Sequence, residues 1–331
     1  MTNHTPIKKY EFEGALAKIC EGFIAEKRGV GYRYNTEAKK LSEFSRFSSS
    51  FDIPADTLPE EVVQAWIAKK PMDSDRNRYA RLALIKLFAE YMLRLGYTAY
   101  CPTKDELGKI QWSYMPYIFT CDEISRFFAA IDGLSYKPYS VSPRRHTVMP
   151  LLFRMLYCCG LRVSEATNLH VKDVSLTDGV LTICESKFGK TRYVPMSDEL
   201  LQVCRVYAID NAVNPQDYFF RAPDGGLYDT RSIYAVFRDT LWKAGISHGG
   251  RGKGPRVHDF RNTFAVHCLE KWLRDGKELT SALPRLSAYL GHNDLTGTER
   301  YLRMTSALYP EITALLDQKY GYIIPKDGGV A

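Results

Sequence analysis

The sequence predicts a mainly α-helical protein of two domains with one small β-hairpin. Three observations indicate this fold class. Apolar residues recur at three- and four-residue spacing in most segments, which is the pattern of amphipathic helices. The alternating pattern of strands is confined to the region around residues 180–195. Between residues 97 and 118 the helical periodicity fades into a stretch that carries Pro102, Gly108 and Pro116.

Composition limits the class of protein. The chain has 331 residues, 45% of them hydrophobic, which is enough for two moderate cores and argues against disorder. Its formal net charge of +7 favours a polyanionic partner if the charge is concentrated on one face. The eight cysteines show no CxxC pair and no metal-ligand spacing, so we expect reduced thiols. We see no signal peptide and no stretch of membrane-spanning length, and we expect a cytoplasmic protein without membrane contact.

The first domain is expected to occupy residues 1–101 and to consist of four helices. Pro59 suits the first turn of the third helix, and Asp73 or Ser74 can cap the fourth, which ends at Gly96. The apolar spacing predicts these helices over residues 10–27, 34–47, 59–67 and 74–96.

A linker is predicted over residues 102–118, followed by a second domain over residues 119–309. Thr120 and Glu123 have the spacing of a capping box, so a helix should begin there. A loop over residues 137–150 then leads to an apolar helix from Leu151 to about Tyr157, and another helix starts at Ser164.

The period changes in the middle of this domain. Residues 180–184 and 192–195 read as two strands of a hairpin, joined by a lysine-rich turn over residues 186–190. Helices return from Asp198 onward, interrupted by a glycine-rich basic loop over residues 249–254. Residues 310–331 are expected to form a C-terminal helix and tail, which packs either on its own domain or on a neighbouring protomer.

Five short motifs carry the chemistry, and their order matters more than any one of them. Arginine guanidinium groups present planar donors that suit the oxygens of a phosphoryl-transfer transition state, and a histidine can act as the base for a tyrosine nucleophile. The motifs are Gly160-Leu-Arg162-Val-Ser-Glu165, Lys187 in the hairpin, His258-Asp-Phe-Arg261 opening a helix, Leu290-Gly-His292 ending one, and Tyr301 nine residues later.

This order of motifs strongly resembles the tyrosine recombinase (phage integrase) family, from about Tyr117 to Met304 and more weakly in the N-terminal region. The resemblance implies a DNA breaking-rejoining fold, in which a SAM-like core-binding domain and a catalytic domain close around duplex DNA. It also implies that Tyr301 attacks the scissile phosphate to give a 3′-phosphotyrosine, without metal or cofactor. Lys187 would be the general acid, and His292 would donate a hydrogen bond to the phosphate. Four protomers would act on two double-stranded DNA sites.

The expected site residues follow from these motifs. Asn262 is a departure, because family members often carry a second histidine after the arginine of the His-x-x-Arg motif. The catalytic set is Arg162, Lys187, His258, Arg261, His292 and Tyr301, and expected phosphate contacts are Lys39, Lys40, Arg76, Arg78, Arg81 and Lys253. Each phosphate contact has a solvated helix face as its alternative interpretation.

Several alternatives stay open at this point. Tyr289 and Tyr309 are rival nucleophiles, and Lys190 and Arg192 compete with Lys187. A metal site lacks the necessary ligand spacing. The alternative functions are DNA relaxation by a type IB topoisomerase and a DNA-binding regulator without catalysis. We expect a site-specific recombinase that integrates, excises or transposes a mobile element.

Overall fold

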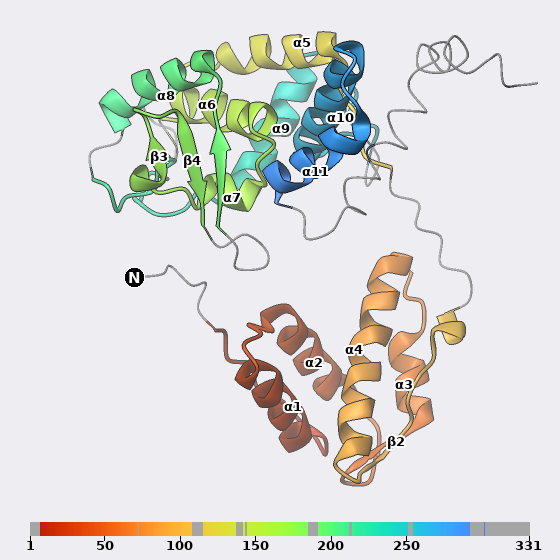
Figure 1. The fold of residues 1–331 in the computed structure, drawn as a ribbon. Coiled ribbons are helices and arrows are strands. Elements are labelled where there is room, and N and C mark those ends of the chain that lie inside the picture. The colour runs from red at the N-terminus through yellow and green to blue at the C-terminus, as the bar shows by residue number, and fades with distance from the viewer. Residues whose placement is uncertain are drawn as a thin grey trace, which may run out of the picture. The chain divides into compact units, whose positions relative to one another are not determined.

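The computed structural model describes residues 7–71, 73–107, 115–136, 142, 144–184, 191–211, 214–250, 254–291 and 301. The chain divides into two compact units, Met1–Tyr114 and Met115–Ala331, each with a hydrophobic core of its own (Figure 1). Among the described residues, no helix combines the length and the apolar character that crossing a membrane requires.

The first unit is a small helical bundle with the four helices that the sequence predicts. Phe23, Phe44 and Phe88 lie at the centre of its core, and the rings of Phe23 and Phe88 meet edge to face at 5.6 Å between centroids. The strands β1 (Thr57–Leu58) and β2 (Thr98–Ala99) form a short parallel pair. The helices are α1 (Ala17–Gly29), α2 (Asn35–Ser48), α3 (Glu60–Ile67) and α4 (Asp75–Arg94).

Two boundaries in this unit test the sequence prediction. Ser74 caps α4 by accepting a hydrogen bond from the backbone N–H of Asn77, so one of the two expected caps is confirmed. The first helix starts at Ala17 and not at residue 10, because Gly14 has a φ of +75° that is not helical. A Cβ on Gly14 would lie 2.9 Å from Cβ of Ser49, so the chain turns there in close contact with the end of α2.

The first part of the predicted linker belongs to the first unit. Lys104–Leu107 forms a short 3-10 helix, η1, and Leu107 is buried in the first core. Glu106 accepts a hydrogen bond of 2.7 Å from Nε2 of Gln64. The chain is therefore packed against α3 and α4 up to residue 107, and the two units divide between Tyr114 and Met115.

The second unit combines seven described helices with a three-stranded sheet. The sheet is antiparallel in the order β3-β4-β5 and consists of β3 (Val174–Ser175), β4 (Val180–Ile183) and β5 (Arg192–Pro195). Figure 1 shows α5, α6, α9 and α10 gathered together with the sheet to one side. The helices are α5 (Cys121–Asp132), α6 (Arg145–Cys158), α7 (Val163–Thr167), α8 (Asp198–Asn211), α9 (Thr230–Lys243), α10 (Asp259–Arg274) and α11 (Leu279–Leu290), with a 3-10 turn η2 (Val171–Asp173).

An aromatic cluster fixes α10 in the middle of this unit. Phe260, in the first turn of α10, stacks on Phe119 at 5.1 Å between ring centroids and meets Phe127 edge-on at 4.9 Å. Phe153 and Phe237 complete its surroundings. All five rings are fully buried, so the start of α10 has little freedom to move.

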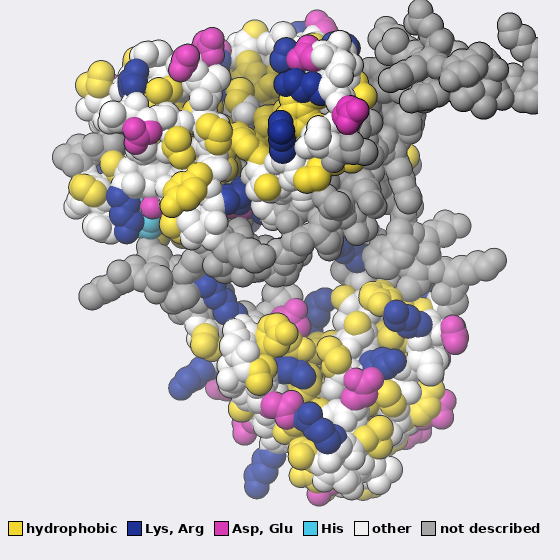
Figure 2. Space-filling view, viewed as in Figure 1, with side chains coloured by type: hydrophobic (Ala, Val, Ile, Leu, Met, Phe, Trp, Pro, Cys, Tyr) yellow, Lys and Arg dark blue, Asp and Glu magenta, His cyan; other side chains and the backbone are white. Residues whose placement is uncertain are grey.

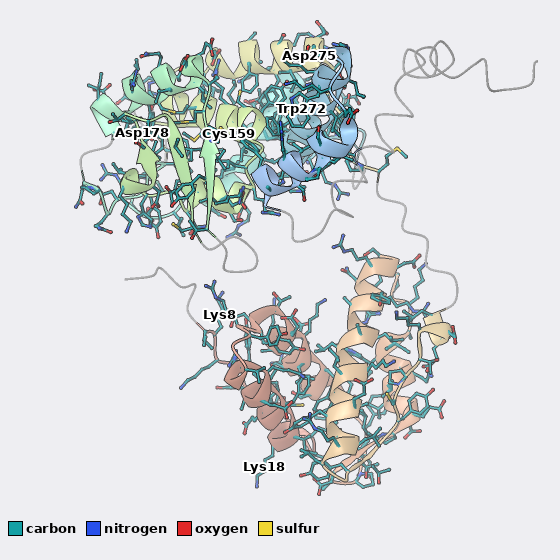
Figure 3. The ribbon with its side chains drawn as sticks, in the orientation of Figure 1. Lys8, Lys18, Cys159, Asp178, Trp272 and Asp275 are labelled. Carbon is teal, nitrogen blue, oxygen red and sulfur yellow. The ribbon has the colours of Figure 1, made fainter. Side chains whose placement is uncertain are left out.

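The local predictions for this unit are partly confirmed. The capping box of Thr120 and Glu123 and the two strands of the hairpin are present. The helix expected from Leu151 begins earlier, at Arg145, and includes Pro150. Proline weakens a helix by removing one N–H, but its fixed φ is compatible with one, and the apolar burial of α6 outweighs the loss. Cys159, at the end of α6, is a buried thiol within the core (Figure 3).

Candidate active site

The turn between α6 and α7 depends on Gly160. Its φ is +58°, and a Cβ at this position would lie 2.6 Å from Cδ1 of Phe264 and 2.9 Å from Cδ2 of Leu290. Only glycine combines this backbone conformation with such close packing against α10 and α11. Arg162 follows as the N-cap of α7, and its backbone N–H donates to Oε2 of Glu165 at 2.8 Å. The first motif is therefore a turn that fixes Arg162 at the start of a helix.

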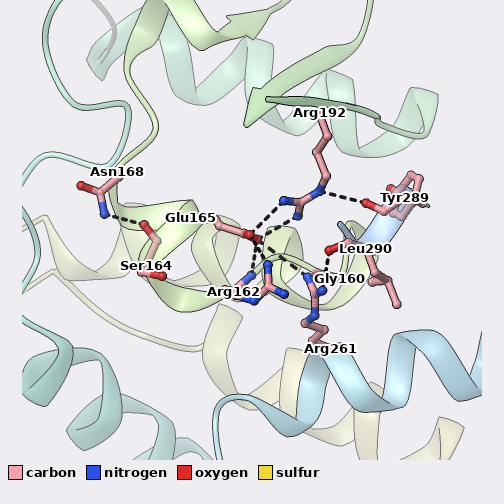
Figure 4. A network of polar contacts seen from close by, with 9 residues as sticks. All are labelled: Gly160, Arg162, Ser164, Glu165, Asn168, Arg192, Arg261, Tyr289 and Leu290. Atoms are coloured by element: carbon pink, nitrogen blue, oxygen red, sulfur yellow. Dashed lines mark hydrogen bonds and ion pairs between the residues drawn. The ribbon is translucent and has the colours of Figure 1, made fainter. Parts of the chain in front are cut away.

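Glu165 connects three arginines from three separate parts of the unit (Figure 4). Its Oε1 accepts hydrogen bonds from Nη1 of Arg162 at 2.6 Å and from Nη1 of Arg192 at 2.9 Å. A second bond of 2.9 Å joins Nη2 of Arg192 to Oε2, so the pair is bidentate. Nη1 of Arg261 lies 3.8 Å from Oε2. One carboxylate thus holds together α7, β5 and α10.

The charges in this arginine cluster do not balance. Burial alone would raise the pKa of Glu165, but the hydrogen bonds from Arg192 and from the backbone of Arg162 lower it to about 2. Burial and the positive charge of Arg162 lower the pKa of Arg261 to about 10, which leaves the guanidinium charged at neutral pH. Three positive groups therefore surround one negative group, and the cluster favours an added anion.

Arg192 and Arg261 also fix the end of α11. Nε of Arg192 donates to the carbonyl oxygen of Tyr289 at 2.9 Å, and Nη2 of Arg261 donates to that of Leu290. Gly291 ends the helix with a φ of +67°, and a Cβ there would lie 3.0 Å from Cδ of Arg192. The glycine of the Leu-Gly-His motif is thus explained by packing, whereas His292 lies outside the described residues.

Arg261 differs from Arg162 in its exposure. Only 1% of Arg261 is exposed, and its Nη1 donates to the carbonyl oxygen of Gly160 at 2.7 Å. The side chain of Arg162 is 22% exposed and donates to Glu165. Arg162 therefore has the most exposed side chain of the three arginines, while Arg261 supplies charge and anchors two backbone segments.

His258 is the N-cap residue of α10 and has an exposed surface. Partial desolvation of the imidazole and the positive charge of Arg261 both lower the pKa of His258. At neutral pH its imidazole is mainly neutral and can accept a proton.

A mostly apolar hollow of about 330 Å³ lies between α7, α9 and the segment before α10. Val163 and Val257 line it, and they adjoin Arg162 and His258 in the sequence. Tyr234 contributes an aromatic ring to the same hollow.

Tyr301 lies against α10 and is only 5% exposed. It belongs to an apolar cluster with Val266 and Leu269 of α10 and Leu290 of α11. Its hydroxyl donates to Oδ1 of Asn262 at 3.2 Å. Tyr301 lies near enough to Arg261 to influence the pKa of the arginine, so the tyrosine is close to the arginine cluster.

The rival Tyr289 has a different environment. Its hydroxyl donates to the carbonyl oxygen of Pro195 at 3.2 Å, which links α11 to β5. Burial raises the pKa of Tyr289, so the phenol is a poor nucleophile at neutral pH. The other rival, Tyr309, lies outside the described residues.

The structure therefore brings together four of the six expected catalytic residues, and the other two lie outside the described part of the chain. The first group is Arg162, His258, Arg261 and Tyr301, and the second is Lys187 and His292. From the sequence, Glu165 is expected only as a member of the first motif and a surface partner of Arg162, and Arg192 only as a rival to Lys187. A signal for Arg192 exists, because the period of two puts it on the same face of β5 as the buried Val194.

Two of the expected phosphate contacts in the first unit are engaged in internal bonds. Arg78 donates through Nε to the carbonyl oxygen of Ile67 at 2.8 Å, and through Nη1 to that of Leu107 at 3.2 Å. Arg81 is 8% exposed, forms an ion pair of 2.5 Å with Asp73, and donates to the carbonyl oxygen of Ala68. Both side chains hold the end of α3, where unpaired carbonyl groups need donors, so neither supports the expected phosphate contact.

The remaining expected contacts differ in exposure. Lys39 and Arg76 are exposed and Lys40 is half-buried, while Lys253 lies outside the described residues. Lys39 lies 3.9 Å from Glu43, at the limit of a weak surface pair. On the face of the first unit visible in Figure 2, basic and acidic side chains are interspersed and form no single basic patch.

Comparisons with known proteins identify the family of the chain. Residues 118–307 match the family described as the phage integrase family. A putative integrase/recombinase, y4rB, of Sinorhizobium fredii is 29% identical over 311 residues, which cover 92% of this chain and 97% of the relative. Tyrosine recombinase XerC of Chlorobaculum tepidum is 28% identical over 295 residues, covering 82% of this chain and 84% of the relative.

Solved structures share the fold. The Tn1549 transposon integrase, in complex with a circular intermediate DNA, aligns with a TM-score of 0.64 and 17% identity, covering 86% of this chain and 94% of its own. XerH site-specific recombinase, bound to a palindromic difH substrate in a post-cleavage complex, aligns with a TM-score of 0.62 and 18% identity, covering 93% and 84%. The mainly α-helical fold class predicted from the sequence is thereby confirmed.

Proposed function

On the premise that this chain belongs to the phage integrase family and is a tyrosine-type site-specific DNA recombinase, we propose that it cuts and rejoins DNA through a 3′-phosphotyrosine at Tyr301. The observation that carries the proposal is that Tyr301 packs against α10, beside a cluster of three arginines around one carboxylate. A nucleophile next to an unbalanced positive cluster suits attack on a phosphodiester.

The proposed reaction exchanges one phosphorus–oxygen bond for another. The phenol oxygen of Tyr301 attacks phosphorus, and the bond from phosphorus to the 5′ oxygen of the next nucleotide breaks. His258 accepts the phenol proton, and Lys187 donates a proton to the departing 5′ oxygen. The free 5′ hydroxyl of a partner strand later reverses the step, so rejoining needs no ATP, and the proposal includes no metal or cofactor.

The arginine cluster has a divided role in this proposal. Arg162 is the more exposed arginine and is placed to donate hydrogen bonds to the non-bridging oxygens, together with His292. Arg192 and Arg261 hold the end of α11, two residues before His292. Donors fixed in this way stabilise charge in the transition state without having to reorganise.

We further propose the biological setting. The substrates are double-stranded recombination sites, and the outcome is integration, excision or transposition of a mobile element. Four protomers assemble on two sites, with residues 310–331 packing on a neighbouring protomer. Lys39, Lys40, Arg76 and Lys253 contact phosphates. Since the substrate is DNA, the proposed location is the cytoplasm.

The test is detection of a covalent protein–DNA adduct. Duplexes that bind the protein are first selected from a random-sequence library, and the enriched sequence is then made with a nick beside each candidate phosphate so that cleavage is trapped. We expect a slowly migrating adduct on a denaturing gel with the wild-type protein and none with Tyr301→Phe.

Tyr309→Phe is the matched control, because it removes the hydroxyl of the rival tyrosine. It should form the adduct at a rate within about twofold of wild type, since the proposed reaction gives the Tyr309 hydroxyl no role. An adduct that persists in Tyr301→Phe and disappears in Tyr309→Phe contradicts the assignment of the nucleophile. Specific binding without any adduct indicates the regulator instead.

A further inference from the structure

Asn262 links the nucleophile to a buried carboxylate. Its Oδ1 accepts the hydrogen bond from the hydroxyl of Tyr301, and its Nδ2 donates to Oδ1 of Asp259 at 2.9 Å. Asp259 is fully buried, and its Oδ2 accepts the backbone N–H of Arg256 at 2.8 Å. Asn262 itself is 6% exposed. A chain of hydrogen bonds thus runs from the start of α10 to the phenol.

The direction of the amide follows from this chain. An ionised carboxylate only accepts hydrogen bonds, so the NH₂ group of Asn262 must face Asp259. The oxygen of the same amide is then left to face Tyr301. An amide oxygen accepts a hydrogen bond from a phenol but does not take its proton, so Asn262 cannot be the base of the reaction.

We propose that Asn262 is a positioning residue for the proposed nucleophile, and that Asp259 turns its oxygen toward Tyr301 to hold the hydroxyl in place in its protonated form. The inference rests on the proposed function of Tyr301 and adds a residue that has no assigned role in it. A neutral phenol gains a hydrogen bond from this oxygen, whereas a phenolate would face an acceptor and gain nothing.

The groups around the phenol allow this effect to be isolated. Among the described residues, Arg261 is a positive group near Tyr301, and its charge favours the phenolate; Asp259 lies behind Asn262. The apolar side chains of Leu286 and Leu290, from α11, belong to the same apolar cluster as Tyr301. Exchanging only the side chain at position 262 therefore changes the acceptor and leaves the other described neighbours in place.

The first experiment titrates the phenol directly. The protein is made with 3-fluorotyrosine at position 301, and fluorine NMR follows the ionisation of that ring as the pH is raised. We expect the midpoint to fall by about one pH unit in Asn262→Ala, because the hydrogen bond that favours the neutral phenol is lost. We expect it to rise in Asn262→Asp, where a carboxylate faces the ring.

Opposite shifts in two variants at one position distinguish positioning from a general loosening of the structure. Asn211→Ala is the matched control, because Asn211 is a buried asparagine in α8 that bonds the carbonyl oxygen of Tyr207. It should leave the midpoint unchanged. If Asn262→Asp does not fold, Asp259→Asn replaces it. The amide of Asn262 is then no longer held by a carboxylate, so it can turn its NH₂ group to the ring and lower the midpoint. An unmoved midpoint in the folded variants overturns the proposal.

The second experiment measures cleavage of the trapped substrate. We expect the single-turnover rate to fall about tenfold or more in Asn262→Ala while DNA affinity stays within about twofold, because a misplaced nucleophile affects the reaction and not binding. An unchanged rate overturns the positioning role. The titration needs no DNA, so its result stands apart from the adduct test: a wild-type protein without adduct refutes the proposed function, whereas an unmoved midpoint refutes this inference.

Discussion

Among the described residues, each unit has one buried arginine on a long helix, and the two are balanced differently. In the first unit Arg81 pairs with Asp73 and donates to one backbone carbonyl, so one positive charge meets one negative charge. In the second unit Arg261 shares Glu165 with Arg162 and Arg192. Burying unbalanced charge is costly, so it is retained where it serves a purpose. The comparison separates an arginine that stabilises the fold from a cluster suited to a phosphate.

Removing the shared carboxylate should have the largest effect. In Glu165→Gln three guanidinium groups lose their buried counter-charge, and we expect the free energy of unfolding of the second unit to fall by about 3–5 kcal/mol. Chemical denaturation followed by fluorescence measures this loss. A change below about 1 kcal/mol would mean that the cluster is not held by Glu165.

Removing the exposed arginine should affect the reaction more than stability. Arg162→Ala takes away the proposed donor to the phosphate, which typically slows a reaction by about 10²–10³-fold. Glu165 keeps Arg192, so the free energy of unfolding should change by about 1 kcal/mol or less. Single-turnover cleavage and denaturation are measured on the same preparation, and a variant that cleaves normally would remove Arg162 from the proposed site.

The balanced pair of the first unit provides the opposite case. Arg81→Met leaves Asp73 buried without its partner and should cost about 3 kcal/mol of unfolding free energy. The double variant Asp73→Leu with Arg81→Met should recover most of that loss, because a balanced pair can be replaced by apolar groups. Adduct formation per folded molecule should stay within about twofold in both variants. A strong loss of chemistry would break the comparison.

The smallest effect is expected at the surface of the first unit. If Lys39 contacts a phosphate, Lys39→Gln should weaken binding and lower the slope of log affinity against log salt by about one. Glu43→Gln is the matched control, since Glu43 is the acidic neighbour of Lys39 on α2. Fluorescence anisotropy over a range of salt concentrations measures the slope, and an unchanged slope assigns Lys39 to a solvated helix face.

Local signals explain what the sequence could predict. The capping box at Thr120, the serine cap at Ser74 and the alternation in β4 and β5 depend on residues close to each other in the chain. Arg162, Arg261 and Tyr301 were predicted in another way, from the family resemblance that the order of motifs carries. Where the physical reason lies within a few residues, sequence and structure agree.

Long-range contacts explain what the sequence could not predict. The bond from Arg192 to Glu165 spans 27 residues, and that from Asn262 to Tyr301 spans 39. No local sequence pattern predicts either of these two contacts. The same holds for Arg81, which reads as an exposed basic residue until the fold places Asp73 and the end of α3 against it.

The aromatic packing of Phe260 has a consequence for DNA binding. Asp259 and Arg261 flank a ring that is locked among buried phenylalanine rings, so the conformational entropy of this turn is lost when the chain folds. Binding of a phosphate beside this turn then has less disorder left to remove. Less of the binding free energy of the phosphate is then spent on ordering the protein, because packing of the core has already ordered this turn. More of it remains to strengthen binding and to lower the activation barrier.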